Sequence, residues 1–169
     1  MSPDTPALQD FYPEDVAHCY GCGRLNGAGL RLRTRWDADE TVTRFTPEPH
    51  HTAIVGTVYG GLVASLLDCH GTGSASAATM RAEGRAIGDG PSPRFVTAAL
   101  KVDFLKPTPL GPELEVRGRI VEIKGRKVVV EETLSAGGVV TATGQVIAVR
   151  MRDDVSPPPR AGGEASGSV

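Results

Sequence analysis

The sequence has few aromatic residues, few cysteines, no excess of one charge and no long apolar run. Aromatic residues make up 5% of the 169 residues, so a core must be built mainly from aliphatic side chains. Three cysteines are too few for a disulfide scaffold, which favours a reducing compartment, and we expect the cytoplasm. The formal net charge is −2 and no basic run is present, so neither nucleic acid nor a membrane surface is expected as a partner.

The ends of the chain also lack strong structural signals. Residues 1–10 do not show the basic and apolar regions of a secretory signal. No apolar stretch reaches the roughly 18 residues that would span a membrane. The length fits one domain, which we place at residues 18–152, after an N-terminal extension over residues 1–17. Residues 153–169 are rich in Pro, Gly and Ser and are expected to be disordered.

Glycine, by contrast, is abundant, with 21 residues in the chain. Several glycines lie in the segment 60–81, whose residues are small or apolar nearly all round and predict a long helix buried on all sides. Alternating apolar and polar residues predict strands on both sides of that helix. These strands are expected at 30–36, 41–46, 95–105, 113–123, 127–135 and 139–151. The order predicts an α+β fold in which an antiparallel sheet of about six strands wraps around one long central helix.

Asp68 stands in the middle of the predicted buried helix, and Gly60 and Gly61 begin it. A buried carboxylate needs either a hydrogen-bond partner in the core or a chemical use as a general base or nucleophile. The free N–H groups at the helix start could polarise a carbonyl oxygen, although two glycines could also serve only close packing. Eight residues of helix separate Gly60 from Asp68 by about 12 Å. If both act on one substrate, they must come from two subunits of a symmetric dimer.

The run from Tyr59-Gly60-Gly61 to Asp68 resembles the motif of hotdog-fold thioesterases, in particular the PaaI-like acyl-CoA thioesterases. In that family a His-Gly-Gly sequence opens the central helix and an acid follows nine residues after the His. The segment from Thr97 to Pro107 is similar to a later family strand, and the segment from His18 to Leu30 looks like a Cys-x-x-Cys-Gly lead-in of many bacterial members.

The resemblance implies hydrolysis of an acyl-CoA thioester by a homodimer or a dimer-of-dimers tetramer, without a cofactor. Asp68 would act as general base or nucleophile, the Gly60 N–H of the other subunit would polarise the carbonyl, and Thr97 would hold Asp68 or the attacking water. Thr97 alternates with Val96 and Ala98, which we assign to the core face, so we expect Thr97 to point away from the helix. An ordinary strand residue is the alternative interpretation of Thr97.

Two positions depart from the family pattern, because Tyr59 replaces the usual His and Ala53 replaces a frequent polar residue. Tyrosine does not titrate near neutral pH, so a mechanism that uses this side chain as a base is disfavoured. His50 and His51 are candidates to replace the missing polar group. Our candidates for substrate binding are therefore Tyr59, Gly61, His50 and His51.

The departures from the family pattern also favour an alternative function, namely a non-hydrolytic hotdog protein that binds acyl-CoA or another acyl thioester. A hotdog dehydratase or hydratase is a third interpretation, but the His of that class is absent from the diagnostic position.

No metal site is expected from the sequence. His18, Cys19 and Cys22 have metal-ligand character, but no second cysteine pair follows, and Cys69 belongs to the helix. A tight glycine-rich turn is the simpler interpretation of this segment. Basic residues that could contact the phosphates of CoA are Arg81, Arg85, Lys101, Lys106, Arg126 and Lys127.

Overall fold

The computed structural model describes residues 6–152 of the chain. Six strands form one sheet in the order β1-β2-β4-β5-β6-β3, and every neighbouring pair is antiparallel. The elements are β1 (Arg35–Asp37), β2 (Glu40–Phe45), α1 (Gly60–Ala82), β3 (Phe95–Phe104), β4 (Leu114–Lys124), β5 (Lys127–Ala136) and β6 (Val139–Arg150). The predicted arrangement of six antiparallel strands and one long helix is thus confirmed.

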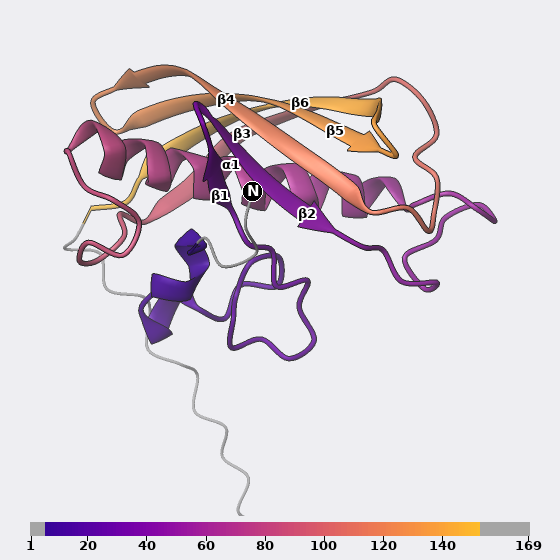
Figure 1. Cartoon of the computed structure of the whole chain (residues 1–169), viewed down its shortest axis with the longest axis horizontal. Helices are drawn as coiled ribbons and strands as arrows, with labels where there is room; N and C mark the ends of the chain where they lie inside the picture. Colours follow the sequence, from indigo (N-terminus) through magenta and orange to yellow (C-terminus); the bar gives the residue numbers. More distant parts are fainter. Residues whose placement is uncertain (1–5, 153–169) are drawn as a thin grey trace, which may run out of the picture.

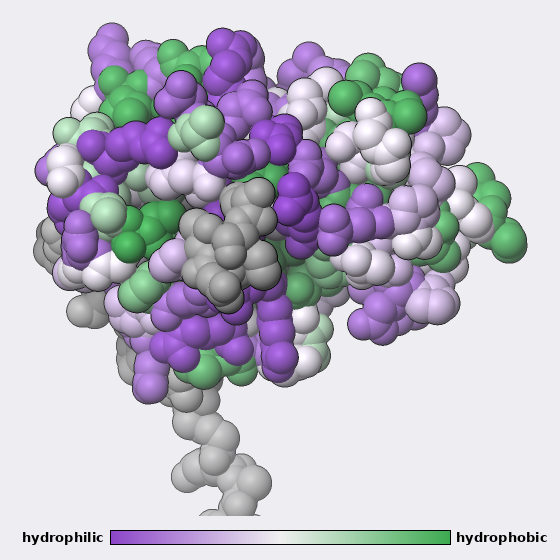
Figure 2. Space-filling view, viewed as in Figure 1, coloured by the Kyte–Doolittle hydropathy of each residue, from purple (hydrophilic) through white to green (hydrophobic). Residues whose placement is uncertain are grey.

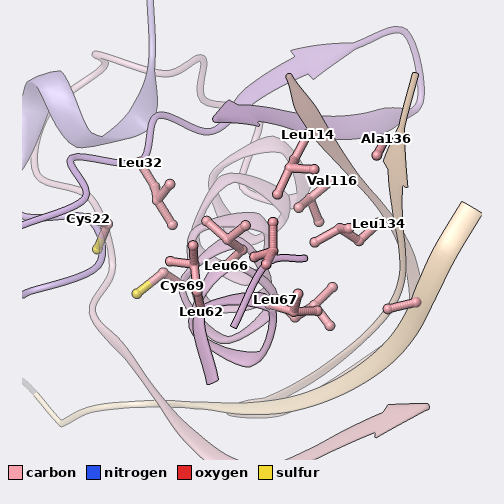
Figure 3. Packing of buried hydrophobic residues seen from close by; sticks show 13 residues of the cluster. Cys22, Leu32, Leu62, Leu66, Leu67, Cys69, Leu114, Val116, Leu134 and Ala136 are labelled. Carbon is pink, nitrogen blue, oxygen red and sulfur yellow. The ribbon is translucent and has the colours of Figure 1, made fainter. Parts of the chain in front are cut away.

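The sheet curves over one side of α1, and the segment that precedes β1 lies against the other side (Figure 1). Leu62, Leu66 and Leu67 of the helix meet Leu114 and Leu134 of the sheet in the largest buried cluster, which contains no aromatic residue among its fully buried members (Figure 3). The helix is buried on several faces, as its uniformly small and apolar sequence predicts.

Glycines in α1 allow close approach on both sides. A Cβ atom at Gly71 would lie 2.5 Å from a methyl carbon of Val146 on β6, so this glycine lets the sheet approach the helix. A Cβ atom at Gly73 would lie 2.8 Å from the hydroxyl oxygen of Thr34, so this glycine accommodates the N-terminal segment instead of the sheet. Each glycine lowers helix propensity by up to about 1 kcal/mol, which the packing must offset.

The first predicted strand, residues 30–36, is wrong in extent because only Arg35–Asp37 pair with β2. Arg31 has a φ of 53°, a left-handed conformation that interrupts an extended strand. The N–H groups of Leu30 and Leu32 donate to carbonyl oxygens of Tyr20 and Gly21. Residues 30–34 are therefore held by the preceding loop rather than by the sheet.

Two short 3-10 helices, Leu8–Phe11 and Glu14–Val16, precede this loop. Leu8 is fully buried and packs beside Ala77 and Met80 of α1. The buried Gln9 side chain donates to the Thr34 hydroxyl and accepts from the Thr34 N–H. Residues 8 and 9 therefore contribute to the packing of the helix, although we assigned them to an extension. The predicted tail, 153–169, lies outside the described residues.

Within residues 6–152, no helix is both long enough and apolar enough to cross a membrane.

Candidate active site

Two groups of predicted site residues occupy two separate places along α1. The first place is the start of the helix, where Tyr59 is the N-cap and Gly60 and Gly61 follow. The first N–H groups that bond the Tyr59 carbonyl are those of Leu62 and Val63. The N–H groups of Gly60 and Gly61 precede them and donate to no acceptor among the described residues, as is usual in the first turn of a helix. The helix therefore presents two free donors at its positive end.

The Tyr59 side chain folds back over this turn. A Cβ atom at Gly61 would lie 2.3 Å from a ring carbon of Tyr59, so only glycine leaves room for the ring in this position. The ring is largely exposed. Its phenol group can donate a hydrogen bond but cannot act as a base near neutral pH.

A cavity of about 400 Å³ opens beside Gly60. Its walls come from the loop before α1, from the end of β3 and from the residues after β3, and they include Ile54, Phe104, Leu105 and Lys106. The ring of Phe104 lies 3.5 Å from the position that a Cβ atom of Gly60 would take. Of the six basic residues predicted as CoA contacts, Lys106 is the one that lines this cavity, and the other five do not line it. Figure 2 shows hydrophobic residues exposed at this end of the molecule.

The second place is the middle of α1, where Asp68 meets Thr97 of β3. The Thr97 hydroxyl donates to Oδ1 of Asp68 over 2.5 Å, and both side chains are partly buried. The expectation that Thr97 points away from the helix is wrong. The register of β3 on β6 shifts between Thr97 and Ala99, so Ala98 forms a bulge that reverses the facing of the strand. Thr97 therefore faces α1, and Leu100 and Val102 face it as well beyond the bulge.

Asp68 and Thr97 line a cavity of about 380 Å³. Cys69 of α1 also lines it, and the other walls come from the N-terminal segment, with Tyr12, Cys19 and Cys22, and from the residues just before β3, with Arg94. This cavity and the one beside Gly60 share no lining residue. Gly60 and Asp68 belong to one continuous helix, so the helical rise separates them by about 12 Å within a single copy of the chain.

His50 and His51 line neither of these two cavities. The Nδ1 atom of His51 accepts the N–H of Glu48, and its carbonyl oxygen accepts the N–H of Tyr59. Burial of the ring and the neighbouring His50 lower the pKa of His51. In the single chain His51 therefore holds the loop that leads into α1.

His70 is a core residue and does not contact Asp68. Its two ring nitrogens bond the hydroxyl groups of Thr41 and Thr43, and burial lowers the pKa of His70 to about 3.

Glu132 on β5 is a buried acid that our sequence reasoning missed. Neither of its carboxyl oxygens has a hydrogen-bond partner within the described part of the chain. The alternation of Val128, Val130, Glu132 and Leu134 is a signal that would have placed it on the apolar face.

The three cysteines lie together, which the sequence reasoning also missed. The Sγ atoms of Cys19, Cys22 and Cys69 all lie within 4.8 Å of one another. We expected the Cys-x-x-Cys pair to lack further ligands because Cys69 belongs to a distant helix. The loop crosses that helix, so the third thiol is supplied by the fold rather than by a local motif.

Comparisons with known proteins agree with this architecture. A family model described as the thioesterase superfamily matches residues 55–143. The crystal structure of a thioesterase superfamily protein from Shewanella loihica is 49% identical, with a TM-score of 0.65, and the match covers 85% of this chain and 99% of that one. No curated protein matches the sequence.

Two more distant structures show the fold alone. The Escherichia coli PaaI protein from the phenylacetic acid degradation operon is 17% identical, covers 73% of this chain and 81% of its own, and has a TM-score of 0.58. A Streptococcus mutans protein bound to acetyl CoA is also 17% identical, covers 71% of this chain and 88% of its own, and has a TM-score of 0.56.

Proposed function

The chain belongs to the thioesterase superfamily, and on that premise we propose that it hydrolyses the thioester bond of an acyl-CoA at a site shared between two copies of the chain. The observation that carries this proposal is the hydrogen bond from Thr97 to Asp68 at the edge of an open cavity. The Thr97 hydroxyl occupies Oδ1, which leaves Oδ2 of Asp68 to act on the substrate. A hydroxyl donor that orients a carboxylate is an arrangement suited to general acid–base chemistry.

The reaction needs two functions that these residues can divide. Asp68 either takes a proton from a water that attacks the carbonyl carbon or attacks that carbon itself. The Gly60 N–H, at the positive end of α1, stabilises the negative charge that develops on the carbonyl oxygen. Collapse of the tetrahedral intermediate then breaks the carbon–sulfur bond and releases CoA as its thiolate. On the water route this gives the free acid at once, and the proton held by Asp68 passes to the thiolate. On the nucleophilic route it leaves a mixed anhydride on Asp68, which water hydrolyses to the free acid and the regenerated carboxylate. Because the two groups are about 12 Å apart on one helix, one must come from each of two copies.

The free edge of β3 supports a second copy at this place. Over its ten residues, β3 pairs only with β6 among the described strands. Val96, Phe104 and Leu105 are exposed along this strand and just beyond it. A long unpaired edge with exposed apolar residues is an unfavourable surface for an isolated chain. We therefore propose a homodimer, either alone or as part of a tetramer.

Two substitutions test the two functions separately. Asp68→Asn should lower turnover by at least about a hundredfold, the scale of a lost general base, on a panel of aliphatic and aryl acyl-CoAs. The matched control Asp39→Asn changes an exposed turn residue and should leave turnover unchanged. Gly60→Pro removes the N–H at the first helical position, where proline is tolerated, and should lower turnover by about 10²–10³-fold. Its control, Gly60→Ala, keeps the N–H and places a Cβ at ordinary contact distance from Phe104.

Mixing the two inactive variants tests whether the site is shared. A mixed dimer of Asp68→Asn and Gly60→Pro chains contains one site with both groups intact and one site with neither. Random exchange of equal amounts should restore about one quarter of wild-type turnover. No recovery after demonstrated exchange, or a stable and active monomer in light scattering, would contradict the shared site.

The alternative function is acyl-CoA binding without hydrolysis. Tyr59 favours this alternative because a tyrosine ring covers the helix turn where the family usually has a His. In that case no acyl-CoA of the panel is cleaved, while calorimetry still measures CoA binding that Asp68→Asn does not weaken.

A further inference from the structure

The three cysteines of the chain form one cluster between the N-terminal loop and α1. Cys19 and Cys22 lie in the loop that precedes β1, and Cys69 follows Asp68 on the helix. All three Sγ atoms lie within 4.8 Å of one another, and those of Cys19 and Cys69 are 3.8 Å apart. In Figure 3, the side chains of Cys22 and Cys69 lie near each other between the loop and the helix.

The loop is shaped to lie directly on Cys69. A Cβ atom at Gly21 would lie 2.1 Å from Sγ of Cys69, so a side chain at this position would push the loop away from the thiol. A Cβ atom at Gly23 would lie 2.5 Å from the backbone of Cys19, and the Gly23 N–H donates to the Cys19 carbonyl over 2.8 Å. This closed turn presents the thiols of Cys19 and Cys22 to Cys69 together.

The spacing of the sulfur atoms fits a tetrahedral thiolate site. With a zinc–sulfur bond of about 2.3 Å, two thiolates of one tetrahedron lie about 3.8 Å apart. We propose that Cys19, Cys22 and Cys69 bind one Zn²⁺ ion, which fastens the N-terminal loop to α1 beside Asp68. Thiolate ligands favour Zn²⁺ over harder divalent cations such as Mg²⁺.

Zinc would bind the three residues as thiolates, because the thiolate and not the thiol is the metal ligand. Binding of the ion would therefore displace the thiol protons, so the affinity for Zn²⁺ should increase with pH.

The fourth ligand comes from the cavity. His18 and the Asp68 carboxylate are not part of the group of ligand atoms that the described residues bring within 4.8 Å. The three cysteines, however, line the same cavity as Asp68 and Thr97. A solvent molecule in that cavity therefore completes the coordination. This proposal is independent of thioester hydrolysis, because it concerns ligands that would bind the ion in an active or inactive protein.

The test measures metal binding by the full chain under reducing, oxygen-free conditions. After removal of metal with a chelator, the protein should take up one equivalent of Zn²⁺, measured by elemental analysis and by competition with a chromophoric chelator. Replacement by Co²⁺ should give the visible absorption of a tetrahedral site together with thiolate charge-transfer bands. Cys19→Ser and Cys22→Ser should each weaken Zn²⁺ binding by more than about a hundredfold, since even loss of an outer-shell partner costs 10–100-fold.

The controls separate ligand loss from misfolding. Cys19 is exposed, so Cys19→Ser should retain the circular dichroism of the folded chain while it loses the metal. His18→Ala, next to the cluster, should bind Zn²⁺ as tightly as the wild type. Uptake far below one equivalent, undiminished binding by folded Cys19→Ser, or a Co²⁺ spectrum without thiolate bands would overturn the proposal. A disulfide between two of the three cysteines that persists under the reducing conditions of the assay, with Zn²⁺ present, would overturn it as well.

Discussion

The substitution Glu132→Gln tests the electrostatics beneath the candidate site. Glu132 is 3% exposed, and its side chain reaches over Gly144, where an added Cβ would lie 3.3 Å from Oε2. Neither carboxyl oxygen has a hydrogen-bond partner among residues 6–152. Burial, and to a lesser degree the charge of Asp68, raise the pKa of Glu132 well above its ordinary value of 4.5. We therefore expect Glu132 to be protonated in the folded protein at pH values where it is ionised in the unfolded chain.

The sign of the effect follows from this difference in protonation. The stabilising contribution of protonated Glu132 is complete below pH 4.5 and is lost as the pH rises toward the folded pKa, because the unfolded chain then releases a proton that the folded chain retains. The loss amounts to about 1.4 kcal/mol for each pH unit over which the folded Glu132 stays protonated. Glutamine has a similar shape and no charge, so the Glu132→Gln variant lacks this loss.

The assay is urea-induced unfolding of both proteins at several pH values from 4.5 upward, and the contribution of His70 cancels because both proteins contain this residue. The free energy of unfolding of Glu132→Gln should rise with pH relative to that of the wild type, by about 1.4 kcal/mol per pH unit as long as the folded Glu132 stays protonated. The control Glu131→Gln changes the neighbouring, half-exposed residue that pairs with Arg119 and should show no such trend. Parallel pH profiles for Glu132→Gln and the wild type would refute the assignment of a protonated buried acid.

Three further predictions concern the helix and its contacts. Gly71→Ala should destabilise the fold by about 1–3 kcal/mol in urea unfolding, because the new Cβ would overlap Val146, and a more stable variant would contradict the close packing. As the pH falls from 6.5 toward 3, His70 alone should lower the stability of the wild type by about 1.4 kcal/mol per pH unit, because the unfolded chain binds a proton that the buried ring does not. Thermal unfolding at several pH values should therefore show a steeper loss of stability for the wild type than for His70→Gln. Thr97→Val should lower turnover of the proposed reaction and leave stability nearly unchanged, whereas Thr97→Ser should restore turnover; equal rates for all three would exclude the role of Thr97 in orienting Asp68.

The strands and the helix could largely be predicted because their patterns are local. The alternation in 113–123 and 127–135 and the uniformly small residues of 60–81 each report burial in their own segment, and the structure confirms an element at each place. The first strand was overestimated because LRLRTRW alternates correctly while Arg31 adopts a left-handed backbone. Periodicity does not report which neighbour an extended segment will bond.

The candidate site was harder to predict because its geometry depends on contacts between distant segments. Asp68 stood out as an acid within an apolar helix, but the bulge at Ala98 reverses the facing of Thr97, and nothing in the alternation of β3 marks that shift. The cluster around Cys69 forms only because the loop before β1 crosses α1. The shared use of Gly60 and Asp68 rests on helix geometry and stays a prediction.

The position of the N-terminal segment has a consequence for how the protein is synthesised and handled. Residues 8–34 emerge from the ribosome before α1, yet the surface on which Leu8 and Cys22 pack belongs to α1, which is completed only at residue 82. The N-terminal segment therefore cannot dock until α1 has been synthesised and has folded. A deletion within residues 8–34 would remove part of the segment that docks late. Such a deletion would remove one wall of the cavity that contains Asp68, so activity would depend on a segment that lies far from Asp68 in the sequence.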